Sequence, residues 1–277
     1  MNEGEKKMLK RTIIIIMACI LIFSGSVMAS EGNNNQFPDV PERALNAYLS
    51  SANYPQEFID SCPYQVKLIL FREKGTYISH TTESQYFVDS SDIDTLAEMG
   101  ILSLPNFTQT VSVSKLTTTT PGIARYHIYY NWVWRHTPFW HLIDKYGIAW
   151  NGDWNYETGS FNAGYMYKRD GWSDVWEFNN QSVSLDTATP GTGVGWKVDI
   201  LSKGYGHSGW GAVNLLKSHD KSGRSDVSSY SAGYFHKVFG ATGSLTFSKT
   251  PSVSITYVSS YQTSSPQAGS WIWYHRD

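Results

Sequence analysis

The sequence predicts a mainly β protein, in which an antiparallel β-sandwich (jelly-roll-like or similar) follows a small N-terminal α+β region. Beyond residue 104 short apolar stretches alternate with turn-forming residues, and helical periodicity is almost absent. All 11 Trp and 13 of the 18 Tyr lie beyond residue 125, and such rings suit a thick interior between two sheets. No helices are visible between the expected strands, which disfavours a parallel α/β fold.

The first 29 residues have the pattern of a secretory signal peptide. Basic residues cluster in 6–11, and an apolar segment follows at 12–23. The cleavage-site pattern at 27–29 predicts cleavage after Ala29. The apolar segment is too short for a bilayer core, which needs about 20 residues. We therefore predict a secreted, extracellular protein with no transmembrane segment after signal cleavage, and a disordered leader at 30–38.

Charge and cysteine content limit the partners and the compartment. Without residues 1–29, which hold four basic and two acidic side chains, 18 Lys and Arg face 22 Asp and Glu. A mildly acidic surface without basic blocks argues against nucleic acid as a partner. Only Cys62 remains, so no internal disulfide can form, and an exported chain without disulfides is typical of a bacterial exoprotein.

The region 39–103 is expected to mix helices and strands. Asp39 and Glu42 resemble a capping box in front of a helix at 41–51, which has an apolar stripe. A second short helical turn starts near Pro55, and a third helical pattern runs from Ser91 to Gly100. Strands are expected at 66–72, 76–81 and 85–88.

The region 104–277 is expected to be the aromatic-rich sandwich. In 124–135 the side chains alternate, so that one face of this strand carries Tyr126, Ile128, Tyr130, Trp132 and Trp134. The other expected strands are 109–117, 142–150, 160–168, 174–178, 193–200, 209–217, 231–239, 243–248, 252–259 and 270–275. No fixed repeat period is present, which disfavours a propeller or a solenoid.

Metal ligands and catalytic groups give no decisive motif, and no cofactor is required. The histidines lack the spacing of a zinc protease helix. Calcium is the metal that composition allows, since hard oxygens gather in two turns: Asn151, Asp153 and Asn155 in one, and Asp170, Ser173 and Asp174 in the other. The carboxylates available for glycoside hydrolysis are Asp144, Asp153, Asp174 and Glu177, and no spacing singles out a pair.

The aromatic surplus suggests a ligand. Both faces of 124–135 hold aromatic residues, although a sandwich interior takes only one face of each strand. Trp154 and Trp172 stand beside turn residues, next to Asp153 and Asp174. Exposed rings flanked by carboxylates suit sugars. We therefore expect a binding protein for extracellular glycan or the cell envelope, with Trp154, Trp172, Asp153 and Asp174 as ligand-binding residues.

Two other functions fit the same sequence. A secreted hydrolase acting on glycan or peptide would use the carboxylates named above. A β-pore-forming toxin would use two-sided strands, and the segments 111–120 and 253–263 alternate small polar with apolar side chains. Half-exposed sandwich strands show the same alternation.

Overall fold

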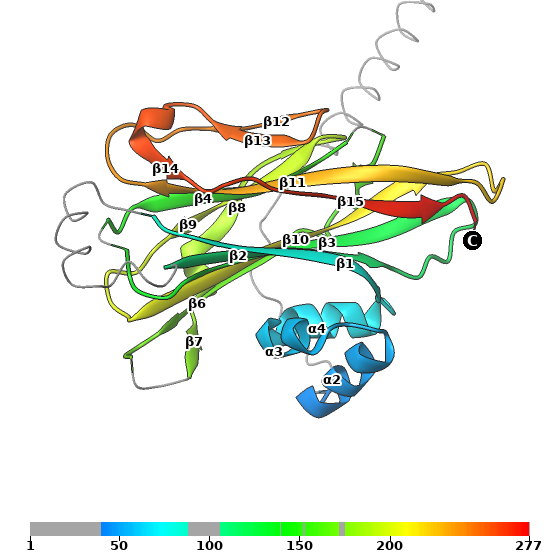
Figure 1. Cartoon of the computed structure of the whole chain (residues 1–277), viewed down its shortest axis with the longest axis horizontal. Coiled ribbons are helices and arrows are strands. Elements are labelled where there is room, and N and C mark those ends of the chain that lie inside the picture. The colour runs from blue at the N-terminus through cyan, green and yellow to red at the C-terminus, as the bar shows by residue number, and fades with distance from the viewer. Residues whose placement is uncertain (1–39, 88–105, 139, 152, 172–174, 277) are drawn as a thin grey trace, which may run out of the picture. The chain divides into compact units, whose positions relative to one another are not determined.

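The computed structural model, shown in Figure 1, describes residues 40–87, 106–138, 140–151, 153–171 and 175–276. Asp39–Asp277 form one compact unit. The fold is mainly β, with two antiparallel sheets packed as a sandwich and a few N-terminal helices, which confirms the predicted fold class. The predicted signal peptide, the predicted leader and the helical pattern from Ser91 to Gly100 lie outside the described residues.

Three helices precede the first strand: α2 (Glu42–Ser51), α3 (Gln56–Ser61) and α4 (Tyr64–Arg72). The first two were predicted. Residues 66–72 were predicted as a strand, and this prediction was wrong. Val66 and Leu70, four residues apart, are fully buried against the other helices, which is the spacing of one helix face. A short unbroken apolar run has no period of its own, so only Pro63 at the helix start indicated a helix.

The first sheet, sheet A, has the strand order β1-β2-β3-β10-β6-β7, and β5 pairs with β10. Its strands are β1 (Thr76–Gln85), β2 (Phe107–Lys115), β3 (Ile123–Trp134), β10 (Gly206–Ser218), β6 (Asn162–Lys168), β7 (Trp176–Phe178) and β5 (Asn155–Tyr156). The strand β1 spans the expected strand 76–81 and reaches Gln85, where a separate strand was expected. The strand β1 belongs to the predicted region 39–103 and pairs with β2 of the predicted region 104–277. The division of the chain at residue 104 remains a prediction.

The second sheet, sheet B, has the order β14-β11-β4-β9-β8, and β15 also pairs with β11. Its strands are β14 (Tyr261–Thr263), β11 (Ser225–Lys237), β4 (Ile143–Trp150), β9 (Gly193–Asp199), β8 (Val183–Thr189) and β15 (Gln267–Tyr274). Neither β8 nor β14 was predicted. The strand β8 has an irregular register between Leu185 and Thr187, which interrupts the alternation that would have indicated a strand.

Two cores explain why β3 is aromatic on both faces. Tyr126, Tyr130, Trp132 and Trp134 point between the sheets and join the main core. Tyr129 points the other way and packs edge-on against Phe58 of α3, with ring centroids 6.0 Å apart. The helices cover this outer face of sheet A (Figure 1). The second aromatic face of β3 is therefore a second core, not the exposed ligand surface that the sequence suggested.

A hairpin of β12 (Leu245–Ser248) and β13 (Ser252–Ile255) lies against the outer face of sheet B. Glycines in sheet B make this close approach possible. A Cβ atom built on Gly195 would lie 2.3 Å from Leu245 Cδ1, and one on Gly193 would lie 2.4 Å from Phe247. The apolar side of the hairpin therefore rests on bare backbone.

Candidate functional site

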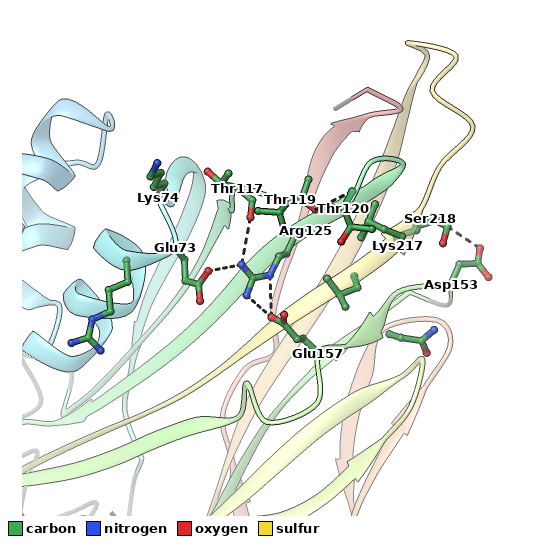
Figure 2. A pocket seen from close by; sticks show the side chains of 15 residues that line it. Glu73, Lys74, Thr117, Thr119, Thr120, Arg125, Asp153, Glu157, Lys217 and Ser218 are labelled. Atoms are coloured by element: carbon green, nitrogen blue, oxygen red, sulfur yellow. Dashed lines mark hydrogen bonds and ion pairs between the residues drawn. The ribbon is translucent and has the colours of Figure 1, made fainter. Parts of the chain in front are cut away.

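A polar pocket with a volume of about 940 Å³ lies at one end of sheet A (Figure 2). Its walls come from the end of α4, the loop between β2 and β3, the start of β3, the residues around β5 and the end of β10. They carry three carboxylates (Glu73, Asp153 and Glu157), four cations (Arg72, Lys74, Arg125 and Lys217) and the threonines 117–120. Small-molecule sites are concave and use a few polar groups to orient the ligand, and this pocket is concave with a lining much richer in charged groups.

The end of α4 brings Glu73 to the pocket. Lys74 follows it with φ +50°, and the amide of Gly75 donates to Leu70 O over 2.7 Å, which closes the last helical turn. Thr117 N donates to Glu73 O over 3.1 Å, so the loop after β2 is tied to the helix end. The wall is therefore held by backbone bonds between two segments distant in sequence.

Arg125 is the central cation of the pocket. Its guanidinium donates through Nη1 to Glu73 Oε2, and through Nε and Nη2 to Glu157 Oε2 at 3.0 and 2.5 Å. Figure 2 shows Arg125 between these two carboxylates. The pKa of Arg125 is raised: burial acts to lower it, but the two carboxylates outweigh burial.

Glu157 is also held from the interior of the protein. Asn214 Nδ2 donates to Glu157 Oε2 over 2.8 Å, so the amide oxygen of Asn214 is left to accept from His127 Nδ1 at 2.7 Å. Burial of Glu157 acts to raise its pKa, but hydrogen bonds from Arg125 and Asn214 lower it. Glu157 is therefore ionised at neutral pH and fixed in orientation.

One oxygen on each side of Arg125 is available to a ligand. Among the described residues, neither Oε1 of Glu73 nor Oε1 of Glu157 makes a hydrogen bond. Each side chain is about one third exposed (35% for Glu73 and 33% for Glu157). The pocket thus presents two oriented acceptors next to one cation.

Lys217 forms the opposite side of the pocket. Its Nζ lies 4.9 Å from the ring centroid of Trp273, 5.7 Å from that of Trp154 and 3.8 Å from Asp153 Oδ2. The two indoles hold the ammonium group by cation–π attraction. Asp153 remains largely open to solvent, with 83% of its side chain exposed.

No family model matches the chain, and no curated protein matches it. Among solved structures, the pilus backbone of Streptococcus pneumoniae has a TM-score of 0.31 and 10% identity, over 46% of this chain and 28% of that chain. Clostridium perfringens delta-toxin has a TM-score of 0.26 and 8% identity, over 72% and 88%. The collagen binding domain of Erysipelothrix rhusiopathiae surface protein RspB has a TM-score of 0.27 and 8% identity, over 62% and 67%. The chain therefore has only distant structural similarity to bacterial surface proteins and toxins, and no specific function follows from it.

The structure places only part of the ligand-binding set predicted from sequence. Asp153 lines the pocket. Trp154 was expected to be exposed, and this expectation was wrong: the side chain is fully buried, and its Nε1 donates to Ser228 Oγ over 2.8 Å. The indole belongs to the main core. Trp172 and Asp174 lie outside the described residues, and their role in binding remains a prediction.

The other carboxylates considered for chemistry are engaged in structure. Asp144 is fully buried and accepts from Tyr234 OH at 2.5 Å and from Lys237 N at 2.8 Å. Glu177 accepts from Tyr167 OH at 2.7 Å and pairs with Arg169. Neither carboxylate lines the pocket.

Two features are absent from the described part of the chain. It holds no group of three or more His, Cys, Asp and Glu side chains placed to bind a metal ion. In the turn considered for calcium, Asn151 Oδ1 already accepts from Ser229 N at 3.2 Å. Within the same residues, no helix is long and apolar enough to cross a membrane.

Arg125, Glu73 and Glu157 were not singled out from the sequence. They are separated by 52 and 32 positions, so no local motif joins them. The one available signal was Arg125 itself, a charged residue at the start of a strongly aromatic strand.

Proposed function

We propose that this protein is a secreted, non-catalytic binding protein whose polar pocket recognises carbohydrate. The observation that carries the proposal is the arrangement around Arg125, where Glu73 and Glu157 each keep one carboxylate oxygen without a hydrogen bond to the described residues. Sugars carry adjacent hydroxyl groups that donate to carboxylates and accept from cations. Asp153, Lys217 and the threonines would supply further polar contacts.

The charge balance of the pocket supports an uncharged ligand. Arg125 is shared by two carboxylates, and Lys217 is placed over two indoles beside Asp153. Four cations face three carboxylates, so neither sign dominates and a polyhydroxylated molecule meets both donors and acceptors. Trp172 and Asp174 stay proposed ligand contacts from the sequence, and no role in this pocket is assigned to them.

A binding comparison with matched variants tests the proposal. The purified protein is titrated calorimetrically with soluble mono- and oligosaccharides, and its retention on insoluble cell-wall polysaccharide is measured. Glu157→Gln keeps the shape but replaces a charged acceptor by a neutral one, and we expect affinity to fall about tenfold or less. Glu42→Gln removes another ion pair, that with Lys67 at 2.7 Å, and serves as the control.

The outcomes separate the alternative functions. Carbohydrate recognition in the pocket is supported if Glu157→Gln weakens retention on the polysaccharide and Glu42→Gln leaves retention unchanged. Release of reducing sugar from the same polysaccharides would instead establish a hydrolase. Dye release from liposomes without any sugar binding would overturn the proposal in favour of pore formation.

A further inference from the structure

A tyrosine at the opposite end of β10 is exposed and yet held in place. Tyr205 immediately precedes β10 and is 43% exposed. The pocket includes Lys217 and Ser218 at the other end of this 13-residue strand. At about 3.4 Å per residue, the two ends lie roughly 40 Å apart.

The backbone around Tyr205 is fixed by hydrogen bonds. Tyr205 N donates to Lys168 O over 2.7 Å. The preceding Gly204 has φ +121°, a conformation that favours glycine, and its carbonyl accepts from Thr137 Oγ1 at 2.6 Å. The loop before β10 is thus tied both to β6 and to the loop after β3.

The ring of Tyr205 is also positioned from two sides. His136 packs edge-on against it, with centroids 4.8 Å apart and an interplanar angle of 85°. A Cβ atom built on Gly171 would lie 3.0 to 3.2 Å from three atoms of the ring. An exposed ring normally needs no explanation, but this one has neighbours that fix its orientation without covering it.

The segments that hold Tyr205 in place also carry charged and aromatic side chains. The exposed Arg169 follows Lys168 and pairs with Glu177 at 2.7 Å. Lys203 Nζ lies 5.9 Å from the ring centroid of Tyr167. Trp140, which is 39% exposed, belongs to the loop between β3 and β4 that also carries His136. A fixed, partly exposed aromatic ring on segments that also carry charged side chains suits a sugar ring, which offers an apolar face and hydroxyl edges.

We propose that Tyr205 forms a second carbohydrate-binding surface, so that one molecule binds two separate glycan segments at the two ends of β10. This inference rests on the proposed function for the class of ligand, but it concerns different residues. Two sites on one rigid scaffold would cross-link polysaccharide chains or bind one polymer with increased avidity.

Calorimetric stoichiometry tests the second surface. The full protein is titrated with cellohexaose and with chitohexaose, each too short to cover both sites. Two oligosaccharides per protein are expected. Tyr205→Ala should remove one of them, and Tyr205→Trp should retain it.

Gly171→Ala should weaken the same site about tenfold by displacing the ring, without a change in melting temperature. Tyr257→Asn removes another exposed ring, in a left-handed conformation that Asn tolerates, and should change nothing.

The other outcomes distinguish the two proposals. A stoichiometry of one that falls with Glu157→Gln and is unaffected by Tyr205→Ala overturns the second surface and leaves the pocket. A stoichiometry of one that is lost with Tyr205→Ala and unaffected by Glu157→Gln overturns the pocket and leaves Tyr205. Absence of binding to every saccharide overturns both.

Discussion

Arg125 donates two hydrogen bonds to a single oxygen of Glu157, from Nε at 3.0 Å and from Nη2 at 2.5 Å. The same oxygen accepts from Asn214 Nδ2 at 2.8 Å. Three donors on Oε2 fix the carboxylate and leave Oε1 for a ligand. Preorganisation of this kind lowers the entropic cost of binding.

Loss of the Asn214 amide should therefore loosen Glu157. In Asn214→Leu, the carboxylate keeps Arg125 but loses its inner donor, and buried His127 Nδ1 loses its acceptor. We expect the free energy of unfolding to fall by about 1–3 kcal/mol and saccharide affinity to fall with it. Urea denaturation and calorimetry measure the two effects. Unchanged affinity in a folded variant would mean that Glu157 does not contact the ligand.

Trp154 should act as a core residue and not as a ligand residue. Trp154→Phe removes the indole N–H that donates to Ser228 and leaves a small cavity, so stability should fall by about 1–3 kcal/mol. Saccharide binding should persist, because the ring is fully buried. The comparison variant is Tyr257→Asn, at an exposed ring, which should leave the melting temperature unchanged. Loss of binding by Trp154→Phe at full stability would contradict the account.

The sequence pattern predicts the aromatic strand but not its surroundings. The alternation in 124–135 identified β3 and its inward face, because that pattern is local. It could not show that Tyr129 on the other face meets Phe58, since 71 positions separate them in the chain. The burial of Trp154 was missed for the same reason: a turn residue looks exposed until the partner strand with Ser228 is known.

The pocket was even harder to predict from the sequence than the burial of Trp154. Asp153 was selected because it stands beside a tryptophan in a turn, and it does line the pocket. Glu73 follows a helix where the sequence predicted a strand at 66–72. The predicted elements therefore gave no reason to place Glu73 near Arg125. The tertiary fold brings these charges together, so no characteristic spacing in the sequence marks them.

Acid should destabilise the protein through His207. Tyr165 OH lies 2.6 Å from Nδ1 and Thr137 Oγ1 lies 2.8 Å from Nε2 of this buried imidazole. Thr137 donates to Gly204 O, so it accepts from Nε2–H, and His207 is neutral. Burial lowers the pKa of His207 to about 4. The unfolded state therefore binds more protons between pH 6.5 and pH 4.

The expected loss is about 2 kcal/mol between pH 7.5 and pH 5 from this group alone. Urea denaturation at the two pH values measures it. His207→Gln should be less stable at pH 7.5 and should show a flatter pH dependence. The exposed His136, changed to Gln, should keep the slope of the unmodified protein. Stability that rises on acidification would contradict the assignment of a neutral histidine.

The hairpin β12–β13 should depend on the glycines beneath it. In Gly195→Ala, the new methyl group would meet Leu245 Cδ1 at 2.3 Å, and overpacking of this kind costs about 1–3 kcal/mol. Leu245→Ala alone should also destabilise, because Leu245 is buried there. In the double variant the two losses should not add, because the shortened side chain makes room for the methyl group. A double-mutant cycle with additive effects would show that the two residues are not in contact.

The measurement that tests the central claim most directly is a crystal structure with a retained oligosaccharide bound. The account predicts a sugar ring in the pocket, with hydroxyl groups donating to Oε1 of Glu73 and Oε1 of Glu157 on either side of Arg125. A saccharide bound elsewhere on the molecule, with these two oxygens facing only solvent, would contradict it.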